Sequence, residues 1–107
     1  MEAVEAEVAR LAELTEGAGR LKRAGAKSVV LFRVDGQVFA VDPVCPHWGG
    51  PMVEGRISHK RMEIECPWHR FRFDLKTGAC VASNLRAGLT VYPVRIDGDR
   101  VFVTVNE

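Results

Sequence analysis

CPHWGGPMVEGRISHKRMEIECPWH, residues Cys45–His69, is the stretch from which the fold and the function of this chain can be predicted. It contains two half-sites, Cys45-Pro46-His47 and Cys66-Pro67-Trp68-His69, with eighteen residues (48–65) between them. Each half-site offers one thiolate and one imidazole, and a proline follows each cysteine directly. Two such half-sites are hard to obtain by accident, so we predict that Cys45, His47, Cys66 and His69 bind one metal centre.

Two thiolates and two imidazoles suit two kinds of metal centre. One is a [2Fe–2S] cluster in which two histidines replace two cysteines on one iron, and the other is a tetrahedral zinc ion. The prolines fix the backbone φ angle after each cysteine, and Gly49 and Gly50 allow a sharp reversal after His47. These four ligands alone do not decide between the iron–sulfur cluster and zinc.

The composition is that of an ordinary globular chain. Of its 107 residues 47% are hydrophobic and 27% are charged, and the formal net charge is +1, which gives no general reason to expect nucleic acid or a membrane as a partner. The apolar runs are too short to span a bilayer, and the acidic start at Glu2, Glu5 and Glu7 is unlike a signal peptide. We therefore expect one cytoplasmic domain, residues 1–107, with its metal-binding subdomain at about residues 43–74.

Two further residues of metal-binding type lie outside the half-sites. Cys80 has no neighbouring histidine and follows Thr77-Gly78-Ala79, a turn-like stretch, so we expect a small buried or half-buried thiol. His59 lies in a charged turn and is expected on the surface rather than among the ligands.

Most of the chain carries signals for short β-strands. Two pairs of strands flank turns that contain Asp-Gly, which is a strong hairpin signal, and two shorter strands lie between these pairs. The expected elements are Ser28–Val34 and Gln37–Val41 around Asp35-Gly36, Val91–Ile96 and Arg100–Val105 around Asp97-Gly98-Asp99, and Arg61–Glu65 and Phe71–Asp74 before a turn at Lys76-Thr77-Gly78.

Two regions do not read as strands. Val4, Val8 and Leu11 fall at helical spacing in a run rich in Ala and Glu that ends at Gly17, so local propensity favours a helix there. Residues 43–55 hold three prolines and three glycines and are expected to form a shaped loop. Helical patterns are missing after residue 16, which predicts a mostly antiparallel all-β domain.

The two half-sites with their flanks, CPHWGGPMVEG and CPWHRFRFDLKTGAC, resemble the signature of Rieske iron–sulfur proteins and look like a soluble Rieske-type ferredoxin. The resemblance implies a fold of three small antiparallel sheets, with one [2Fe–2S] cluster carried on two loops at one tip. Cys45 and Cys66 would hold the inner iron, and His47 and His69 the more exposed outer iron. It also implies a strand at Glu7–Arg10, which we adopt in place of the helix.

This chain departs from part of the family at four positions. Respiratory and photosynthetic members join two further loop cysteines in a disulfide, and the corresponding positions here are Gly50 and Trp68. Those members also tend to place Ser and Tyr, which donate O–H bonds to the cluster, where this chain has Phe71 and Phe73. Because such hydrogen bonds stabilise the reduced cluster, their absence implies a low reduction potential.

The neighbours of the half-sites have expected roles as well. Trp48 and Trp68 are expected either to cover the cluster and limit water or to serve packing alone. Val81–Leu89 corresponds to a covering loop that is often proline-rich in the family but has no proline here. Arg70 stands where many members have Gly. The basic residues form either a collar around the exposed histidines or a solvated face of scattered charges, and they are Arg56, Lys60, Arg61, Arg70 and Arg72.

These features predict an electron carrier rather than an enzyme, since the chain has no nucleotide loop and no Ser–His–Asp arrangement. By resemblance it would pass single electrons from a reductase to a terminal oxygenase or a similar enzyme. One alternative is a small subunit of a nitrite reductase-like complex. The other is an interaction module stabilised by zinc, although structural zinc sites typically use Cys-x₂₋₄-Cys and His-x₃₋₅-His spacings that are absent here.

Overall fold

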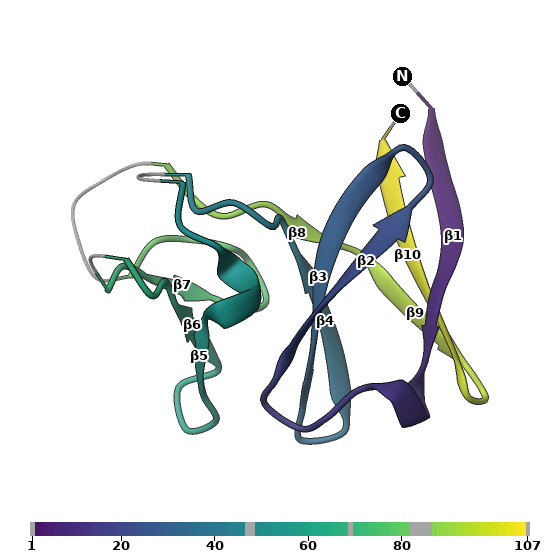
Figure 1. The fold of residues 1–107 in the computed structure, drawn as a ribbon, viewed down its shortest axis with the longest axis horizontal. Coiled ribbons are helices and arrows are strands. Elements are labelled where there is room, and N and C mark those ends of the chain that lie inside the picture. Colours follow the sequence, from purple (N-terminus) through teal and green to yellow (C-terminus); the bar gives the residue numbers. More distant parts are fainter. Residues whose placement is uncertain (1, 47–48, 69, 82–86, 107) are drawn as a thin grey trace.

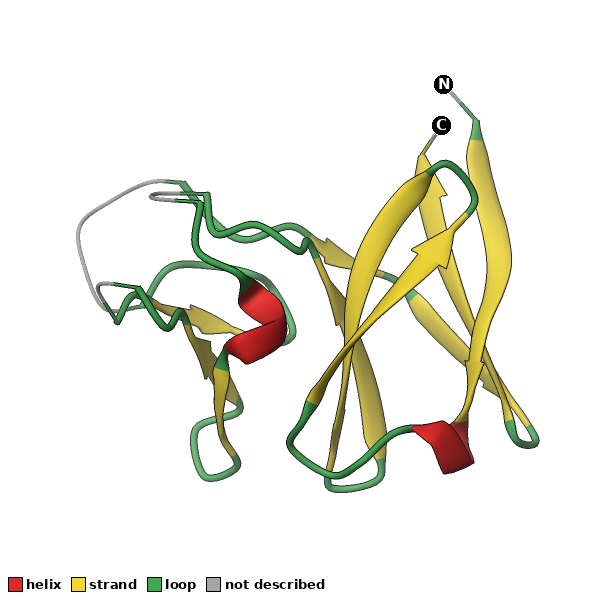
Figure 2. Cartoon of the chain, in the orientation of Figure 1, coloured by secondary structure: helices red, strands yellow, loops and turns green. Residues whose placement is uncertain are grey.

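The structure, a computed structural model, describes residues 2–46, 49–68, 70–81 and 87–106. These residues form short β-strands and two single-turn 3₁₀ helices, η1 and η2 (Figures 1 and 2). The elements are β1 (Ala3–Arg10), η1 (Leu11–Glu13), β2 (Gly19–Ala24), β3 (Lys27–Val34), β4 (Gln37–Val41), η2 (Met52–Glu54), β5 (Arg56–Ser58), β6 (Glu63–Glu65), β7 (Arg72–Asp74), β8 (Val91–Tyr92), β9 (Val94–Asp97) and β10 (Arg100–Asn106).

The strands form three antiparallel sheets, in the orders β1-β10-β9, β2-β3-β4-β8 and β5-β6-β7. The first two sheets share one half of the molecule, and the β5-β6-β7 sheet stands apart on the other side (Figure 1). The helix η2 lies between the two halves and contacts β2 and β3 (Figure 2). The predicted all-β fold of three small antiparallel sheets is confirmed. No helix in the described ranges is long and apolar enough to cross a membrane.

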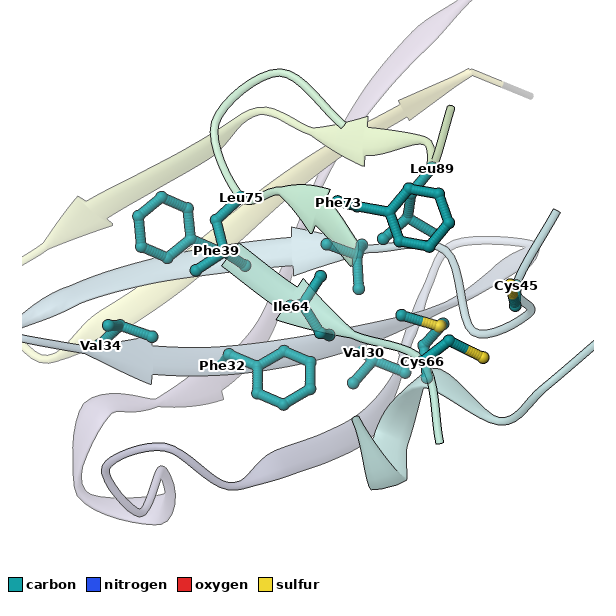
Figure 3. Packing of buried hydrophobic residues seen from close by; sticks show 12 residues of the cluster. Val30, Phe32, Val34, Phe39, Cys45, Ile64, Cys66, Phe73, Leu75 and Leu89 are labelled. Atoms are coloured by element: carbon teal, nitrogen blue, oxygen red, sulfur yellow. The ribbon is translucent and has the colours of Figure 1, made fainter. Parts of the chain in front are cut away.

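The strand β3 contributes side chains to two buried clusters, one on each of its faces. Val29 and Leu31 point into a buried cluster shared with β1, β4 and β10, whereas Val30, Phe32 and Val34 point into a second cluster on the opposite face. The second cluster, here called the cysteine-containing cluster, consists of Val30, Phe32, Val34, Phe39, Val41, Cys45, Met52, Ile64, Cys66, Phe73, Leu75 and Leu89. Figure 3 shows Cys45 and Cys66 at one end of it and Val34 and Phe39 at the other. Cys45 and Cys66 are therefore part of the packed interior.

The N-terminal segment is a strand, so the helix favoured by local propensity is wrong and the strand implied by the family is confirmed. β1 pairs along its length with β10, in a register that sets Val4 opposite Val105 and Ala6 opposite Val103. A register shift between Glu7 and Ala9 turns both Val8 and Ala9 into the core. Pairing with β10 thus overrides a helix propensity that is worth only a fraction of a kcal/mol per residue.

The expected strand Val91–Ile96 is two strands, which is a second correction. Pro93 separates β8, which pairs with β4, from β9, which pairs with β10. Proline has no N–H for a β ladder, and the chain changes sheets at this residue. The Pro93 carbonyl instead accepts a hydrogen bond from the Thr104 N–H at 3.0 Å.

Other strand boundaries also differ from the sequence prediction. The strands β2 and β5 were not predicted, and the expected strands Arg61–Glu65 and Phe71–Asp74 shorten to Glu63–Glu65 and Arg72–Asp74. Met62 has a φ of 53°, a left-handed conformation that places Arg61 and Met62 in the turn before β6. The two hairpin turns at Asp35-Gly36 and at residues 97–99 lie where they were predicted.

His59 is exposed, as expected, and it connects the two halves of the molecule. Its Nε2 lies 2.9 Å from Oε2 of Glu16, and the same carboxylate oxygen accepts a hydrogen bond of 2.8 Å from the Asp35 N–H. The Asp35 N–H and, to a smaller extent, the His59 ring hold the pKa of Glu16 below its usual value. Glu16 lies between η1 and β2, and through its carboxylate the β5–β6 turn is joined to the β3–β4 turn.

Candidate metal centre

The first half-site lies on a loop closed by backbone hydrogen bonds. The Cys45 N–H donates to the Gly50 carbonyl at 2.9 Å, and the Gly49 N–H donates to the Cys45 carbonyl at 3.0 Å. Gly49 has a φ of 74°, which an L-residue adopts only with strain. The Met52 N–H donates to the Pro43 carbonyl at 2.9 Å and closes the base of the loop. The proline- and glycine-rich stretch is thus the shaped loop that the sequence predicted.

The second half-site repeats this design. The Cys66 N–H donates to the Phe71 carbonyl at 2.7 Å, five residues later, as Cys45 does to Gly50. Arg70 has a φ of 57° and stands four residues after its cysteine, as Gly49 does. Both loops therefore place a left-handed residue at the same offset, a conformation that glycine adopts without strain.

Replacing Arg70 with glycine is expected to stabilise the fold by about 1 kcal/mol, because an L-residue in the left-handed region costs roughly that amount. The measurement is the free energy of unfolding from urea titrations followed by circular dichroism. Arg56→Gly is the matched control, since Arg56 lies in a strand, where glycine is destabilising. If both variants lose stability alike, the strain at Arg70 is not real.

Both cysteines are almost completely buried, with Cys45 1% and Cys66 0% exposed. Burial and, to a smaller extent, the neighbouring Cys45 thiol raise the pKa of the Cys66 thiol to about 11, against an opposing hydrogen bond from the Trp68 backbone. In the metal-free chain this thiol is therefore protonated at neutral pH. A metal that takes Cys66 as thiolate must displace the proton, which couples metal binding to pH.

Gly50 lies close to the sulfur of Cys66. A Cβ atom at Gly50 would stand 2.6 Å from the Cys66 Sγ and 3.3 Å from the Trp68 Cβ. The first distance is too short for a real Cβ atom, so glycine at this position lets the first loop approach the Cys66 sulfur. The 3.3 Å between the Cβ positions of Gly50 and Trp68 approaches the Cβ–Cβ separation of roughly 3.8 Å found across disulfides. The positions matched to the family's disulfide cysteines are therefore neighbours in this structure.

The side chains around the cysteines are apolar. Met52 and Phe73 are fully buried with them, and Phe71 is half-buried against the same cluster. Trp68, which was expected to cover the site, is 50% exposed, and Val44 beside Cys45 is 51% exposed. Cys80 is half-buried against the cysteine-containing cluster, as predicted.

Three of the five basic residues gather at one place. Arg56, Arg61 and Arg72 line one hollow on the outer face of the β5-β6-β7 sheet, together with Glu63 and Glu65. Lys60 lies in the β5–β6 turn and Arg70 in the second loop, both exposed. Glu63 and Glu65 were not predicted from the sequence to be part of this surface. Because β5 was not predicted, the alternating side chains of β6 could not be assigned to the inner or the outer face of a sheet.

Several predicted residues lie outside the described part of the chain. His47, His69 and Trp48 are among them, as are residues 82–86 of the covering loop Val81–Leu89. The structure brings the two cysteines together, and the histidine ligands remain predictions from the sequence.

Comparison with known proteins decides the family. A family model described as the Rieske [2Fe-2S] domain matches residues 5–93. The chain belongs to this family. Rieske membership implies one [2Fe–2S] cluster, and two buried cysteines that lie in one cluster offer the thiolate ligands that such a group takes.

Rieske relatives of similar length are electron-transfer components. The ferredoxin component of the naphthalene 1,2-dioxygenase system of Pseudomonas aeruginosa is 35% identical over 80 residues, which is 75% of each chain. Among solved structures, the ferredoxin of carbazole 1,9a-dioxygenase from Nocardioides aromaticivorans IC177 has a TM-score of 0.85 and 30% identity, and the match covers 94% of this chain and 96% of that one.

Two further Rieske structures bear on partners. A chain in a complex of reduced oxygenase and oxidized ferredoxin of carbazole 1,9a-dioxygenase matches with a TM-score of 0.80 and 28% identity, covering 94% of this chain and 92% of that one. A Mycobacterium tuberculosis protein assigned as an NADH-dependent nitrite reductase small subunit matches with a TM-score of 0.87 and 27% identity, covering 100% and 99%.

Proposed function

We propose that this chain is a low-potential one-electron carrier that passes electrons from a reductase to a terminal oxygenase or a similar enzyme in the cytoplasm. The observation that carries the proposal is the pair of buried cysteines on two loops of the same design, in a chain that matches the Rieske family over residues 5–93. A bound [2Fe–2S] cluster supplies reversible one-electron transfer. The relatives' role as ferredoxin components of dioxygenase systems supports the same partners here.

The proposed ligands are the thiolates of Cys45 and Cys66 and the imidazoles of His47 and His69. The backbone bonds that close the two loops hold the cysteines in place, and the apolar residues below exclude water from the thiolates. We further propose that the chain is one domain, residues 1–107, with a cluster-binding subdomain at about residues 43–74.

The test is spectroscopy of the purified protein after expression with iron. A Rieske centre is coloured, and after reduction by dithionite it gives an electron paramagnetic resonance signal that reflects imidazole-bound iron. A colourless protein that contains zinc and gives no signal would overturn the proposal in favour of the zinc-stabilised interaction module.

A second candidate is a permanently bound small subunit of a nitrite reductase-like complex. It is favoured by the similarity to the Mycobacterium tuberculosis chain, which extends over the whole length of both. Size-exclusion chromatography separates the two candidates, because a diffusing carrier leaves its partner on dilution and a subunit elutes with it.

A midpoint potential near the low end of the Rieske span of roughly −150 to +300 mV is expected, because Phe71 and Phe73 offer no hydroxyl group to the cluster. Phe71→Ser should raise the midpoint in a redox titration if its hydroxyl reaches a cluster sulfur. Phe71→Ala removes the same ring without adding a hydroxyl and is the matched control. A midpoint well above zero in the unmodified protein, or equal shifts in the two variants, would contradict this explanation.

A further inference from the structure

The outer face of the β5-β6-β7 sheet carries a row of charged side chains. In the antiparallel register Glu65 stands opposite Arg56 on one side and Arg72 on the other. The next residues in each strand, Ile57, Ile64 and Phe73, pack against the core, so the charged row faces away from it. Over this face lies a hollow of about 200 Å³, whose lining consists of Arg56, Arg61, Arg72, Glu63 and Glu65 together with Ile57 and Ser58.

The charges in this hollow are only partly paired. Arg72 Nη1 lies 3.4 Å from Glu63 Oε1, and the two side chains are 33% and 15% exposed. Arg56 and Arg61 form no ion pair with any residue in the described ranges, although Glu65 is opposite Arg56 in the sheet. Arg56 and Arg61, both exposed, are thus available to a ligand in the hollow that they line.

Residues that line the hollow lie directly before and directly after the second loop, residues 66–71. Glu65 directly precedes Cys66, and Arg72 directly follows Phe71, whose carbonyl accepts the hydrogen bond from the Cys66 N–H. A group held in the hollow would therefore be anchored next to the loop that carries Cys66 and His69.

We infer that this hollow docks a carboxylate-bearing segment of the electron-transfer partner protein, with Arg56 and Arg61 as its contacts; the inference rests on the proposed function. The planar guanidinium group pairs with carboxylates in two parallel hydrogen bonds, which fixes orientation as well as adding affinity. An extended acidic segment can place separate carboxylates on Arg56 and Arg61, which line the same hollow, and competition by inorganic phosphate distinguishes such a segment from a phosphate-bearing partner. Charge pairing of this kind also speeds the encounter of two proteins at low salt.

The test compares two double variants of the cluster-loaded protein for binding of a hexaglutamate peptide at low ionic strength. Arg56→Glu with Arg61→Glu should weaken binding about tenfold or more, which corresponds to the loss of about one charge-assisted hydrogen bond. The control is Arg23→Glu with Lys27→Glu, which makes the same change in net charge at exposed positions of the β2–β3 hairpin, in the other half of the molecule (Figure 1). Binding should survive in the control.

Three results would overturn the inference: no binding of hexaglutamate by the unmodified protein, an equal loss in both double variants, or competition by inorganic phosphate at equal concentration. A second measurement uses the oxidation of the reduced protein by ferricyanide, an anion, and by hexaammineruthenium, a cation. The Arg56/Arg61 variant should slow the first reaction relative to the second, and an unchanged ratio would show that the hollow is not near the electron path. Peptide binding does not need a redox-active cluster, so a failure of the proposed function would appear separately, in the spectrum.

Discussion

A Cys66→Ser chain is expected to lose its [2Fe–2S] cluster. Cys66 is fully buried beside Cys45, and its loop is closed by the hydrogen bond from its own N–H to Phe71. Serine is a hard oxygen ligand with a far higher pKa, so it cannot replace a soft thiolate on iron. The expected result is the loss of visible colour, of the electron paramagnetic resonance signal and of bound iron and sulfide, all measured on one preparation. Cys45→Ser should have the same effect.

Cys80→Ser is the matched control for this experiment. It is the same substitution at the third cysteine, which is half-buried and packs against the cysteine-containing cluster from the side. Its iron content and signal should equal those of the unmodified protein. Loss of the cluster in the Cys80 variant, or retention in the Cys66 variant, would contradict the ligand set Cys45, His47, Cys66 and His69.

The proximity of the two half-site cysteines was the most predictable feature of this chain, for a chemical reason. Thiolates and imidazoles are rare and specific ligands. Two half-sites with a proline after each cysteine therefore predict a metal site, even when the strands between them are assigned incorrectly. The structure confirms that Cys45 and Cys66 come together. The left-handed backbone at Arg70 could not be predicted from its own side chain, because nothing in an arginine indicates a positive φ. It follows only from comparison with Gly49 at the same offset in the first loop.

The strands were predictable where they end in turn residues and contain β-branched side chains. β3 and β4 meet both conditions around Asp35-Gly36, and their predicted ranges agree with the structure to within one residue. β2 (Gly19–Ala24) alternates poorly and carries three basic residues, so only its pairing with β3 makes it a strand. The N-terminal segment carried a helical signal. Its conformation is decided instead by pairing with β10, which lies 90 or more residues away in the sequence. Local sequence contains no information about such a partner.

Replacing Phe73 with alanine is expected to destabilise the fold by about 3–5 kcal/mol, the usual cost of removing a buried aromatic ring and leaving a cavity. Phe73 is fully buried in β7, between the β5-β6-β7 sheet and the core strands, in the cluster that contains Cys45 and Cys66 (Figure 3). The measurement is urea unfolding followed by circular dichroism, with the midpoint and the slope fitted separately. A loss of that size is a large part of the stability of a domain this small.

Leu21→Ala is the control for packing, because the Leu21 side chain on β2 is 56% exposed. This substitution should change the free energy of unfolding by less than about 0.5 kcal/mol. The position of Phe73 gives the experiment a second readout. The cavity would form in the cluster that contains Cys45 and Cys66, so the Phe73 variant should also release iron faster to a chelator, in conditions where it is still folded. Weakened folding with an unchanged rate of iron release would mean that the core below the cysteines does not hold the two loops in place.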